Sequence, residues 1–206
     1  AIWGISKVME SDVAGFQAVS DSLALGESTV AVASAGAEQI TNLLNEMKEK
    51  VVAATGENVD HAKITADVNE LKAQITSIIS ASQFNGTNLL DTAGGDITVL
   101  SSLDRDSGGT VTAANITVAS VDFEAGLDLT TINVSSAVAA DASLDDVETL
   151  IQAAVDGAAA LGASAKRISD QNVFVGNVMD AMKSGIGSLV DADMEAASAR
   201  LQALQT

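Results

Sequence analysis

VETLIQAAVDGAAALGASAKRISDQNVFVGNVMDAMKSGIGSL, residues 147–189, carries apolar or small side chains at alternating intervals of four and three residues. Such side chains lie along one face of a helix. The stretch therefore predicts one helix of roughly 65 Å, at about 1.5 Å per residue. Asn172 is a polar exception that either fixes a coiled-coil register or lies on a partly solvated face. The positions are Val147, Ile151, Ala154, Ala158, Leu161, Ala165, Ile168, Asn172, Val175, Met179, Met182, Ile186 and Leu189.

Two helical stretches precede this one in the chain. The first is expected from about Ser11 to Ala54, with Gly56 as its stop. Glycines at positions 15, 26 and 36 weaken its helical propensity, so tertiary packing has to hold this segment. The second runs from about Asp60 to about Ser80 and returns antiparallel to the first. Its heptad seam comprises Ile64, Val68, Leu71, Ile75 and Ile78.

The middle of the chain lacks the helical pattern of its two flanks. Ser143 or Asp141 is expected to cap the helix that follows it. Glycine-rich turns and β-branched residues predict short strands around residues 107–109. A further alternation of apolar residues over residues 127–134 is typical of another strand. The predicted fold is mainly α with a small β part: an elongated antiparallel bundle or coiled-coil rod with a β-hairpin region at one end. It divides into residues 1–82 (two long helices), 83–142 (hairpin and turns) and 143–206 (the long C-terminal helix).

Composition narrows the possible functions. The 206 residues carry a formal net charge of −18, with no cysteine, no proline and one histidine. An acidic chain is a poor match for phosphate backbones, and no apolar run is long enough for membrane insertion. His61 reads as an ordinary surface histidine, and residues 104–109 lack the glutamate of a calcium loop. We expect no nucleic-acid binding, no metal, no cofactor and no catalytic site.

One motif resembles a known family. Residues 82–90, SQFNGTNLL, contain Gln83, Phe84, Asn85 and Gly86, and they resemble the segment that closes the N-terminal helical half of bacterial flagellin. There the chain turns from the second helix into a β-hairpin. Residues 31–54 look like the long N-terminal flagellin helix, and residues 188–201 look like the end of its C-terminal core helix. The resemblance covers essentially the whole chain.

The resemblance implies the helical core domain D1 of a filament subunit. Its expected partners are other flagellin subunits in a homopolymer, and flagellar export and capping proteins. Its expected location is the extracellular bacterial flagellum, where it serves motility. The terminal D0 helices are expected to be missing, because the chain starts at Ala1 and ends without a helix stop.

One segment departs from the family pattern. In flagellins detected by the vertebrate Toll-like receptor, the first long helix carries a Leu-Gln-Arg-Val-Arg-Glu-Leu-type sequence. Here the corresponding residues are Leu44, Asn45, Glu46, Met47, Lys48, Glu49 and Lys50. Glu46 reverses the charge of the first arginine, which supplies a planar set of donors. The resemblance then implies weak or no receptor recognition, as in flagellins of alphaproteobacterial type.

Two alternative functions stay open at this stage. One is a hook–filament junction protein of the same fold. The other is a secreted coiled-coil adhesin or receptor-binding protein that forms no filament. Both bury helix seams like those of a filament subunit, so the sequence alone does not separate the three.

Overall fold

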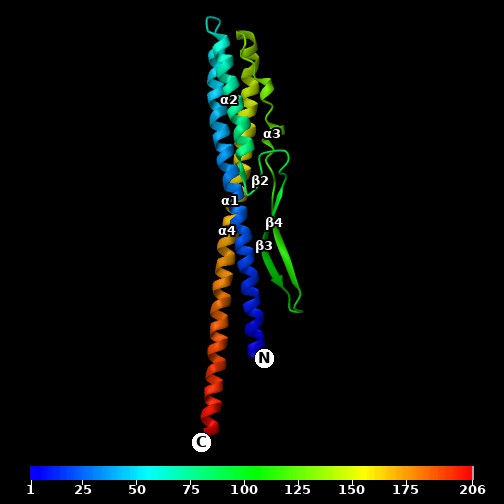
Figure 1. The fold of residues 1–206 in the computed structure, drawn as a ribbon, viewed down its shortest axis with the longest axis vertical. Helices are drawn as coiled ribbons and strands as arrows, with labels where there is room; N and C mark the ends of the chain where they lie inside the picture. The colour runs from blue at the N-terminus through cyan, green and yellow to red at the C-terminus, as the bar shows by residue number, and fades with distance from the viewer. Residues whose placement is uncertain (206) are drawn as a thin grey trace. The chain divides into compact units, whose positions relative to one another are not determined.

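The computed structural model, which describes residues 1–205, contains long helices and a small antiparallel β part (Figure 1). The helices are α1 (Ile2–Ala54), α2 (His61–Ala81), α3 (Phe123–Gly126) and α4 (Ala137–Gln205), with a 3-10 turn η1 (Leu129–Thr131). The strands are β1 (Gln83–Phe84), β2 (Thr87–Asn88), β3 (Ile97–Arg105) and β4 (Val111–Val118). β1 pairs with β2, and β3 pairs with β4. The predicted fold class, mainly α with a small β part, is confirmed.

The chain forms two compact units. Unit 1 comprises residues 1–26, 98–116 and 167–206, and unit 2 comprises residues 27–97 and 117–166. Each unit therefore contains part of α1 and part of α4, which are far apart in the sequence. The β3–β4 hairpin belongs mostly to unit 1, whereas α2, β1, β2 and α3 belong to unit 2.

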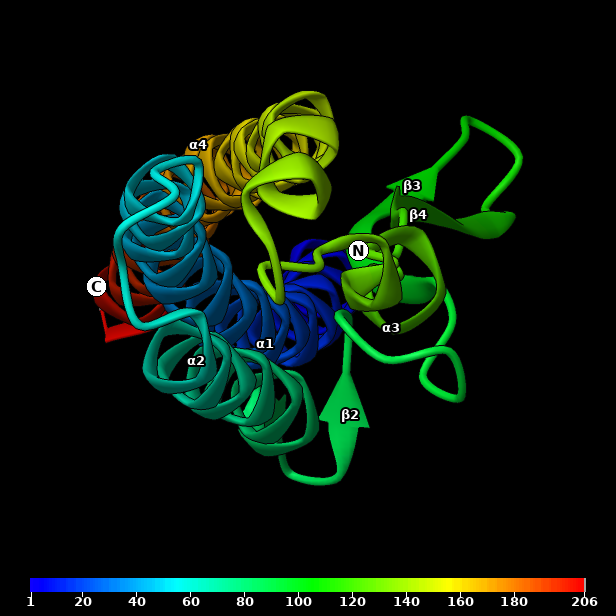
Figure 2. The same cartoon turned by 90° about the horizontal axis from the view of Figure 1, so that it is seen from above.

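Unit 2 is built from α2 and the adjoining parts of α1 and α4, seen end-on in Figure 2. Asp60 caps α2, because its Oδ1 atom accepts a hydrogen bond from Lys63 N at 3.1 Å. The turn after α1 lies at residues 55–60, as the glycine at position 56 predicts. The three helices bury a thin aliphatic core that includes Leu44, Met47, Ile75, Val147 and Leu161.

Unit 1 joins α1 and α4 through the hairpin. Leu100 N donates to Ser22 Oγ on α1 at 3.1 Å, and Gln171 Nε2 on α4 donates to Ser101 O at 2.8 Å. Arg105 also binds the carboxylate of Asp12, with Nη2 2.8 Å from Oδ1. The strand β3 is therefore held by polar contacts to both helices. Its apolar side chain Val99 is buried in the same unit.

Two helical glycines of α1, Gly15 and Gly26, lie where the hairpin approaches closely. A Cβ atom added to Gly26 would lie 2.7 Å from Val99 Cγ2, and one added to Gly15 would lie 2.7 Å from Leu103 Cδ1. Atoms do not approach this closely without displacement. Glycine therefore lowers the helix propensity here, and in exchange it lets the strand contact the helix backbone.

Two helix boundaries differ from the sequence expectation. α1 begins at Ile2 rather than near Ser11, because its first turns pack on α4 within unit 1: a Cβ atom added to Gly185 would lie 3.0 Å from Met9 Cε. α4 begins at Ala137, where Ser136 Oγ accepts from Ala139 N at 3.1 Å. The expected cap at Ser143 or Asp141 is wrong. The Ser143 hydroxyl is buried and bonds the backbone of Asn133 instead.

The expected strand over residues 127–134 is also wrong. This segment contains η1, and Leu127, Ile132 and Val134 are buried against the helices of unit 2 without a partner strand. Side chains satisfy its backbone in place of a β ladder: Lys72 Nζ donates to Ile132 O at 2.7 Å. Partial burial lowers the pKa of Lys72. The apolar residues alternate here because one side of an extended segment packs against the helices.

Candidate functional site

The segment that corresponds to the receptor motif lies on α1 in unit 2. Leu44 and Met47 are fully buried in the helical core, whereas Glu46 and Glu49 are exposed. Lys48 and Lys50 are partly buried. The outward face of the segment therefore presents two carboxylates. The apolar residues of the segment pack against other parts of the same chain.

Both lysines of this segment form ion pairs inside the unit. Lys48 pairs with Glu148 on α4, and Lys50 Nζ lies 3.3 Å from Asp67 Oδ2 on α2. Hydrogen bonds from Lys63 and Lys50 lower the pKa of Asp67 below its ordinary value. The pairs hold the two cationic side chains against neighbouring helices. Among residues 1–205, the exposed carboxylates of Glu46 and Glu49 take part in none of the ion pairs.

The depressed pKa of Asp67 predicts a stability effect at low pH. A carboxyl with a lowered folded-state pKa stabilises the fold fully above its unfolded pKa of about 3.9, and loses that contribution as the pH falls through the folded value. Asp67→Asn is therefore expected to make the melting temperature less dependent on pH below about pH 4. The measurement is thermal unfolding by circular dichroism across that range. Glu70→Gln, at an exposed position on the same helix, is the control, and an equal change there would contradict the assignment to Asp67.

The Gln-Phe-Asn-Gly motif forms a tight turn after α2. Gln83 pairs with Asn88 and Phe84 with Thr87, so Asn85 and Gly86 are the two turn residues. Their φ angles are 51° and 82°, in the left-handed region. Two-residue hairpins favour Asn-Gly for this conformation. Gly86 N also donates to Gln83 Oε1 at 2.8 Å, which closes the turn through a side chain of the motif.

Sequence reasoning missed Asn88, the residue that joins this turn to the helix. The Asn88 side chain is buried, and its Nδ2 atom donates to Ile79 O near the C-terminus of α2 at 2.7 Å. Its Oδ1 atom accepts from Leu90 N at 2.8 Å and from Asp91 N at 3.2 Å. One amide thus satisfies three backbone groups. The only signal in the sequence was a second asparagine two residues after the Asn-Gly pair.

The positive φ angle at Gly86 predicts opposite outcomes for two glycine substitutions. Gly86→Ala is expected to lower the free energy of unfolding by about 1 kcal/mol, because an L-residue is strained in the left-handed region. Gly162→Ala is expected to raise it by up to about 1 kcal/mol, because alanine favours a helix and a Cβ atom there meets nothing within 4 Å. Urea unfolding measures both. Equal effects at the two positions would contradict the turn geometry.

The predicted helix seams lie mostly inside the chain. On α2, Val68, Leu71 and Ile75 are buried and Ile64 is partly buried. On α4, Ile168 and Val175 are buried in unit 1, and Met182 and Leu189 are partly buried. Asn172 is half-buried, and its Oδ1 atom accepts a hydrogen bond from Ser20 Oγ at 3.1 Å. The asparagine therefore connects α4 to α1 within one chain.

Neither a cluster of metal ligands nor a helix suited to crossing a membrane is found among the described residues. Residues 1–205 contain no group of three or more His, Cys, Asp or Glu side chains that could hold a metal ion. His61 Nε2 lies 2.9 Å from Ala54 O at the end of α1, which is a structural contact between two helices. No helix within residues 1–205 is long and apolar enough to cross a membrane.

Comparisons with known proteins place both long helices in one family. The model of the bacterial flagellin N-terminal helical region matches residues 1–94, and the model of the C-terminal helical region matches residues 144–206. Flagellin FljM of Caulobacter vibrioides is 38% identical, over 100% of this chain and 74% of its own length. Flagellin of Brucella melitensis is 35% identical, over 98% of this chain and 74% of its own length.

A solved structure shares the fold. The crystal structure of Bacillus cereus flagellin matches with a TM-score of 0.53, covering 88% of this chain and 94% of that chain. The sequence identity in this match is 20%. At that identity the similarity concerns the fold alone.

Proposed function

The chain belongs to the bacterial flagellin family and is a structural subunit of the flagellar filament, and we propose that it assembles with further copies by packing exposed helix faces. The observation that carries the proposal is the match of both terminal regions to flagellin models. These regions include α1 and most of α4, and both helices contribute to both compact units. The role is structural, and assembly takes the place of catalysis.

The proposed partners follow from membership of the family. Flagellar export proteins carry the chain out of the cell, capping proteins guide its addition to the growing end, and other copies form the extracellular filament. The two alternatives raised by the sequence, a junction protein and a secreted adhesin, gain no support from the fold or from the relatives. The filament subunit is the function that the similarities favour.

A complementation experiment tests this function. The full chain that carries this sequence is produced in an alphaproteobacterium whose own flagellin genes have been deleted. We expect filaments by negative-stain electron microscopy and recovery of swimming in soft agar. The same strain without an export apparatus should retain the chain inside the cell. Secretion of soluble chain with no filament would contradict the proposed role.

Weak or absent recognition by the Toll-like receptor is a further part of the proposal. It is supported by the exposed carboxylate of Glu46 at the place of the first arginine. It is also supported by the intrachain pairing of Lys48 and Lys50. A receptor surface that accepts arginine would face a carboxylate, and like-charge contacts at an interface cost several kcal/mol.

A cell reporter assay checks the receptor proposal. We expect no signal from the protein at concentrations where a receptor-active flagellin is saturating. Glu46→Arg combined with Lys50→Leu, which restores the family pattern at two positions, is expected to increase signalling. Glu38→Arg, an exposed charge change on the same helix, serves as the control. Strong signalling by the unmodified protein would overturn the proposal.

A further inference from the structure

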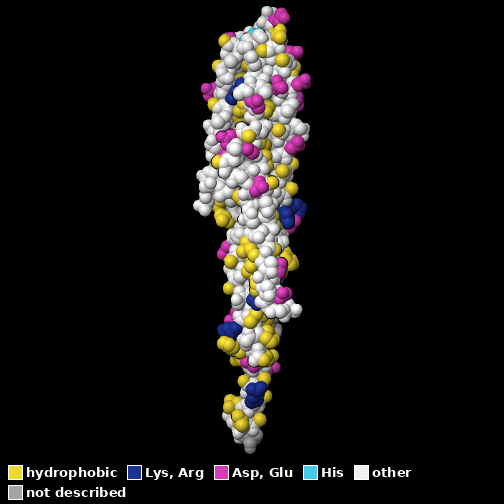
Figure 3. All heavy atoms as spheres, turned by 90° about the vertical axis from the view of Figure 1, so that its right-hand side faces the viewer, with side chains coloured by type: hydrophobic (Ala, Val, Ile, Leu, Met, Phe, Trp, Pro, Cys, Tyr) yellow, Lys and Arg dark blue, Asp and Glu magenta, His cyan; other side chains and the backbone are white. Residues whose placement is uncertain are grey.

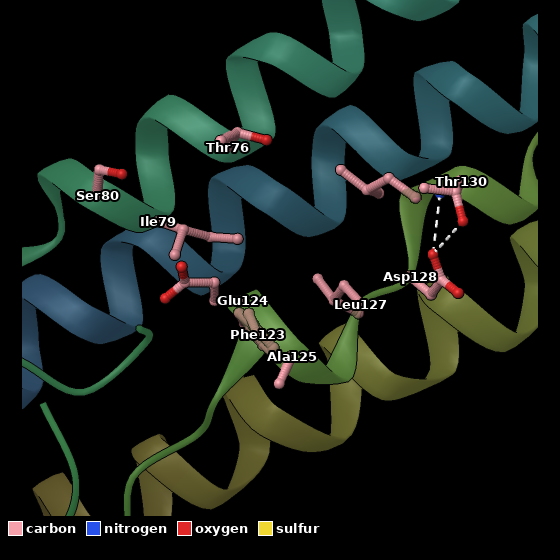
Figure 4. A pocket seen from close by; sticks show the side chains of 10 residues that line it. Thr76, Ile79, Ser80, Phe123, Glu124, Ala125, Leu127, Asp128 and Thr130 are labelled. Atoms are coloured by element: carbon pink, nitrogen blue, oxygen red, sulfur yellow. Dashed lines mark hydrogen bonds between the residues drawn. The ribbon is translucent and has the colours of Figure 1, made fainter. Parts of the chain in front are cut away.

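A groove in unit 2 lies between α2 and the segment from α3 to η1 (Figure 4). It has a volume of about 390 Å³. Thr76, Ile79 and Ser80 line it from α2, and residues 123–125 and 127–130 line it from the other side. The apolar lining is formed by Ile79, Phe123, Leu127 and Leu129.

The rim of this groove is acidic. Glu124 and Asp128 both line it, and both are exposed. Glu124 Oε2 accepts from Thr92 N at 2.9 Å, and Asp128 Oδ1 accepts from Thr130 N at 3.1 Å. These bonds fix the two carboxylates and leave further lone pairs on each. An apolar floor with two fixed carboxylates suits an apolar side chain accompanied by a cation.

Unit 1 exposes an aromatic side chain on α4. Phe174 is 56% exposed and its neighbour Val173 is 63% exposed. Trp3 is more exposed still, at 72%, but Lys7 Nζ lies 5.9 Å from its ring centroid in an intrachain cation–π contact. Phe16 and Phe123 are buried. Phe174 is therefore the exposed phenylalanine best suited to anchor a contact, since aromatic anchors dominate interface energies.

Basic side chains are few on this acidic chain, and the face drawn in Figure 3 shows more acidic than basic side chains. Lys7, Lys48, Lys50, Lys63 and Arg105 form ion pairs within the chain. The Arg167 side chain is exposed and makes no ion pair or hydrogen bond among residues 1–205. It precedes Phe174 by two helical turns, roughly 10 Å along α4. Arginine and an aromatic side chain are the types most enriched at interface centres.

We propose that the groove of unit 2 receives Phe174 from α4 of a second copy, with Arg167 of that copy paired to Glu124 and Asp128. The inference rests on the proposed filament function, because it names a contact between subunits. Charge complementarity selects this occupant. Copies with a net charge of −18 repel one another, and a free arginine entering an acidic rim offsets that repulsion locally.

Seeded assembly of the full chain tests the contact through its critical concentration. Phe174→Ala is expected to raise the critical concentration about tenfold or more, the loss typical of an interface anchor. Its melting temperature should not change, because the side chain is exposed. Val138→Ala, also highly exposed on α4, is the matched control and should assemble normally. Arg167→Glu should also impair assembly, and adding Glu124→Arg and Asp128→Arg to it should restore assembly.

Cross-linking identifies which segment occupies the groove. The sequence contains no cysteine, so only the introduced thiols react. Filaments are assembled from a mixture of Ser80→Cys chains and Asn177→Cys chains and treated with a short bismaleimide. We expect a heterodimer. Replacing Ser80→Cys by Gln152→Cys, on an exposed face outside the groove, should abolish it.

Two results separate this inference from the proposed function. Failure of the unmodified chain to form filaments would overturn both. Normal filaments from the unmodified chain, together with normal assembly of Phe174→Ala and no heterodimer, would overturn the inference alone. Cross-linking of Ser80→Cys to a different protein or to another face of the subunit would also overturn it.

Discussion

Replacing Asn88 with leucine is expected to lower the free energy of unfolding by about 3 kcal/mol or more, because each buried polar group left without a partner costs about 1–3 kcal/mol. Three groups lose their partner at once: Ile79 O, Leu90 N and Asp91 N. Leucine has a similar size but no hydrogen-bonding atom. Urea unfolding followed by circular dichroism measures the change.

Asn69→Leu is the matched control for this substitution. Asn69 is exposed on α2, and leucine is a better helix former than asparagine. We expect no loss of stability there. An Asn88→Leu variant as stable as Asn69→Leu would show that the amide does not hold the turn to α2.

Replacing Phe123 with alanine is the second large effect, with an expected loss of about 3–5 kcal/mol. Phe123 is buried on the short helix α3 and packs on the backbone of α4. A Cβ atom added to Gly157 would lie 2.6 Å from Phe123 Cε1. Truncation leaves a cavity that a rigid helix backbone cannot collapse to fill. Thermal and urea unfolding both report the loss.

Phe174→Ala is the control with the same chemistry and the opposite burial. It should change the free energy of unfolding by less than about 0.5 kcal/mol, as for surface positions in general. A second test uses the space that the mutation creates. Gly157→Val alone is expected to be destabilising, and in combination with Phe123→Ala its cost should be smaller. Additive effects of the two changes would contradict their contact.

The helices were predictable where local signals agreed. α2 has a heptad seam, an N-cap at Asp60 and no internal glycine, and its observed bounds differ from the expected ones by one residue. The Asn-Gly turn was likewise readable, since few residue pairs adopt positive φ angles at low cost. The division into residues 1–82, 83–142 and 143–206 stays a prediction.

Other features depended on contacts between distant residues. The helix was predicted across Gly15 and Gly26, but nothing local explains why glycine stands there, because the reason lies in Leu103 and Val99 on the hairpin. The alternation at residues 127–134 is the same for a strand and for a segment packed on one side. The pairing of Lys50 with Asp67 was equally unpredictable until α1 and α2 were placed together.

The sequence by itself determined the helical class of this chain, its sharp turn after α2 and its family, because periodicity, turn chemistry and a short motif are local properties. Only the tertiary structure decided which seam residues are buried within the chain, which backbone groups Asn88 binds, and which side chains are exposed to solvent. Phe174 and Phe123 are the same residue type in the sequence. Phe123 is buried against Gly157, whereas Phe174 is exposed, because burial depends on which other parts of the folded chain lie next to the side chain.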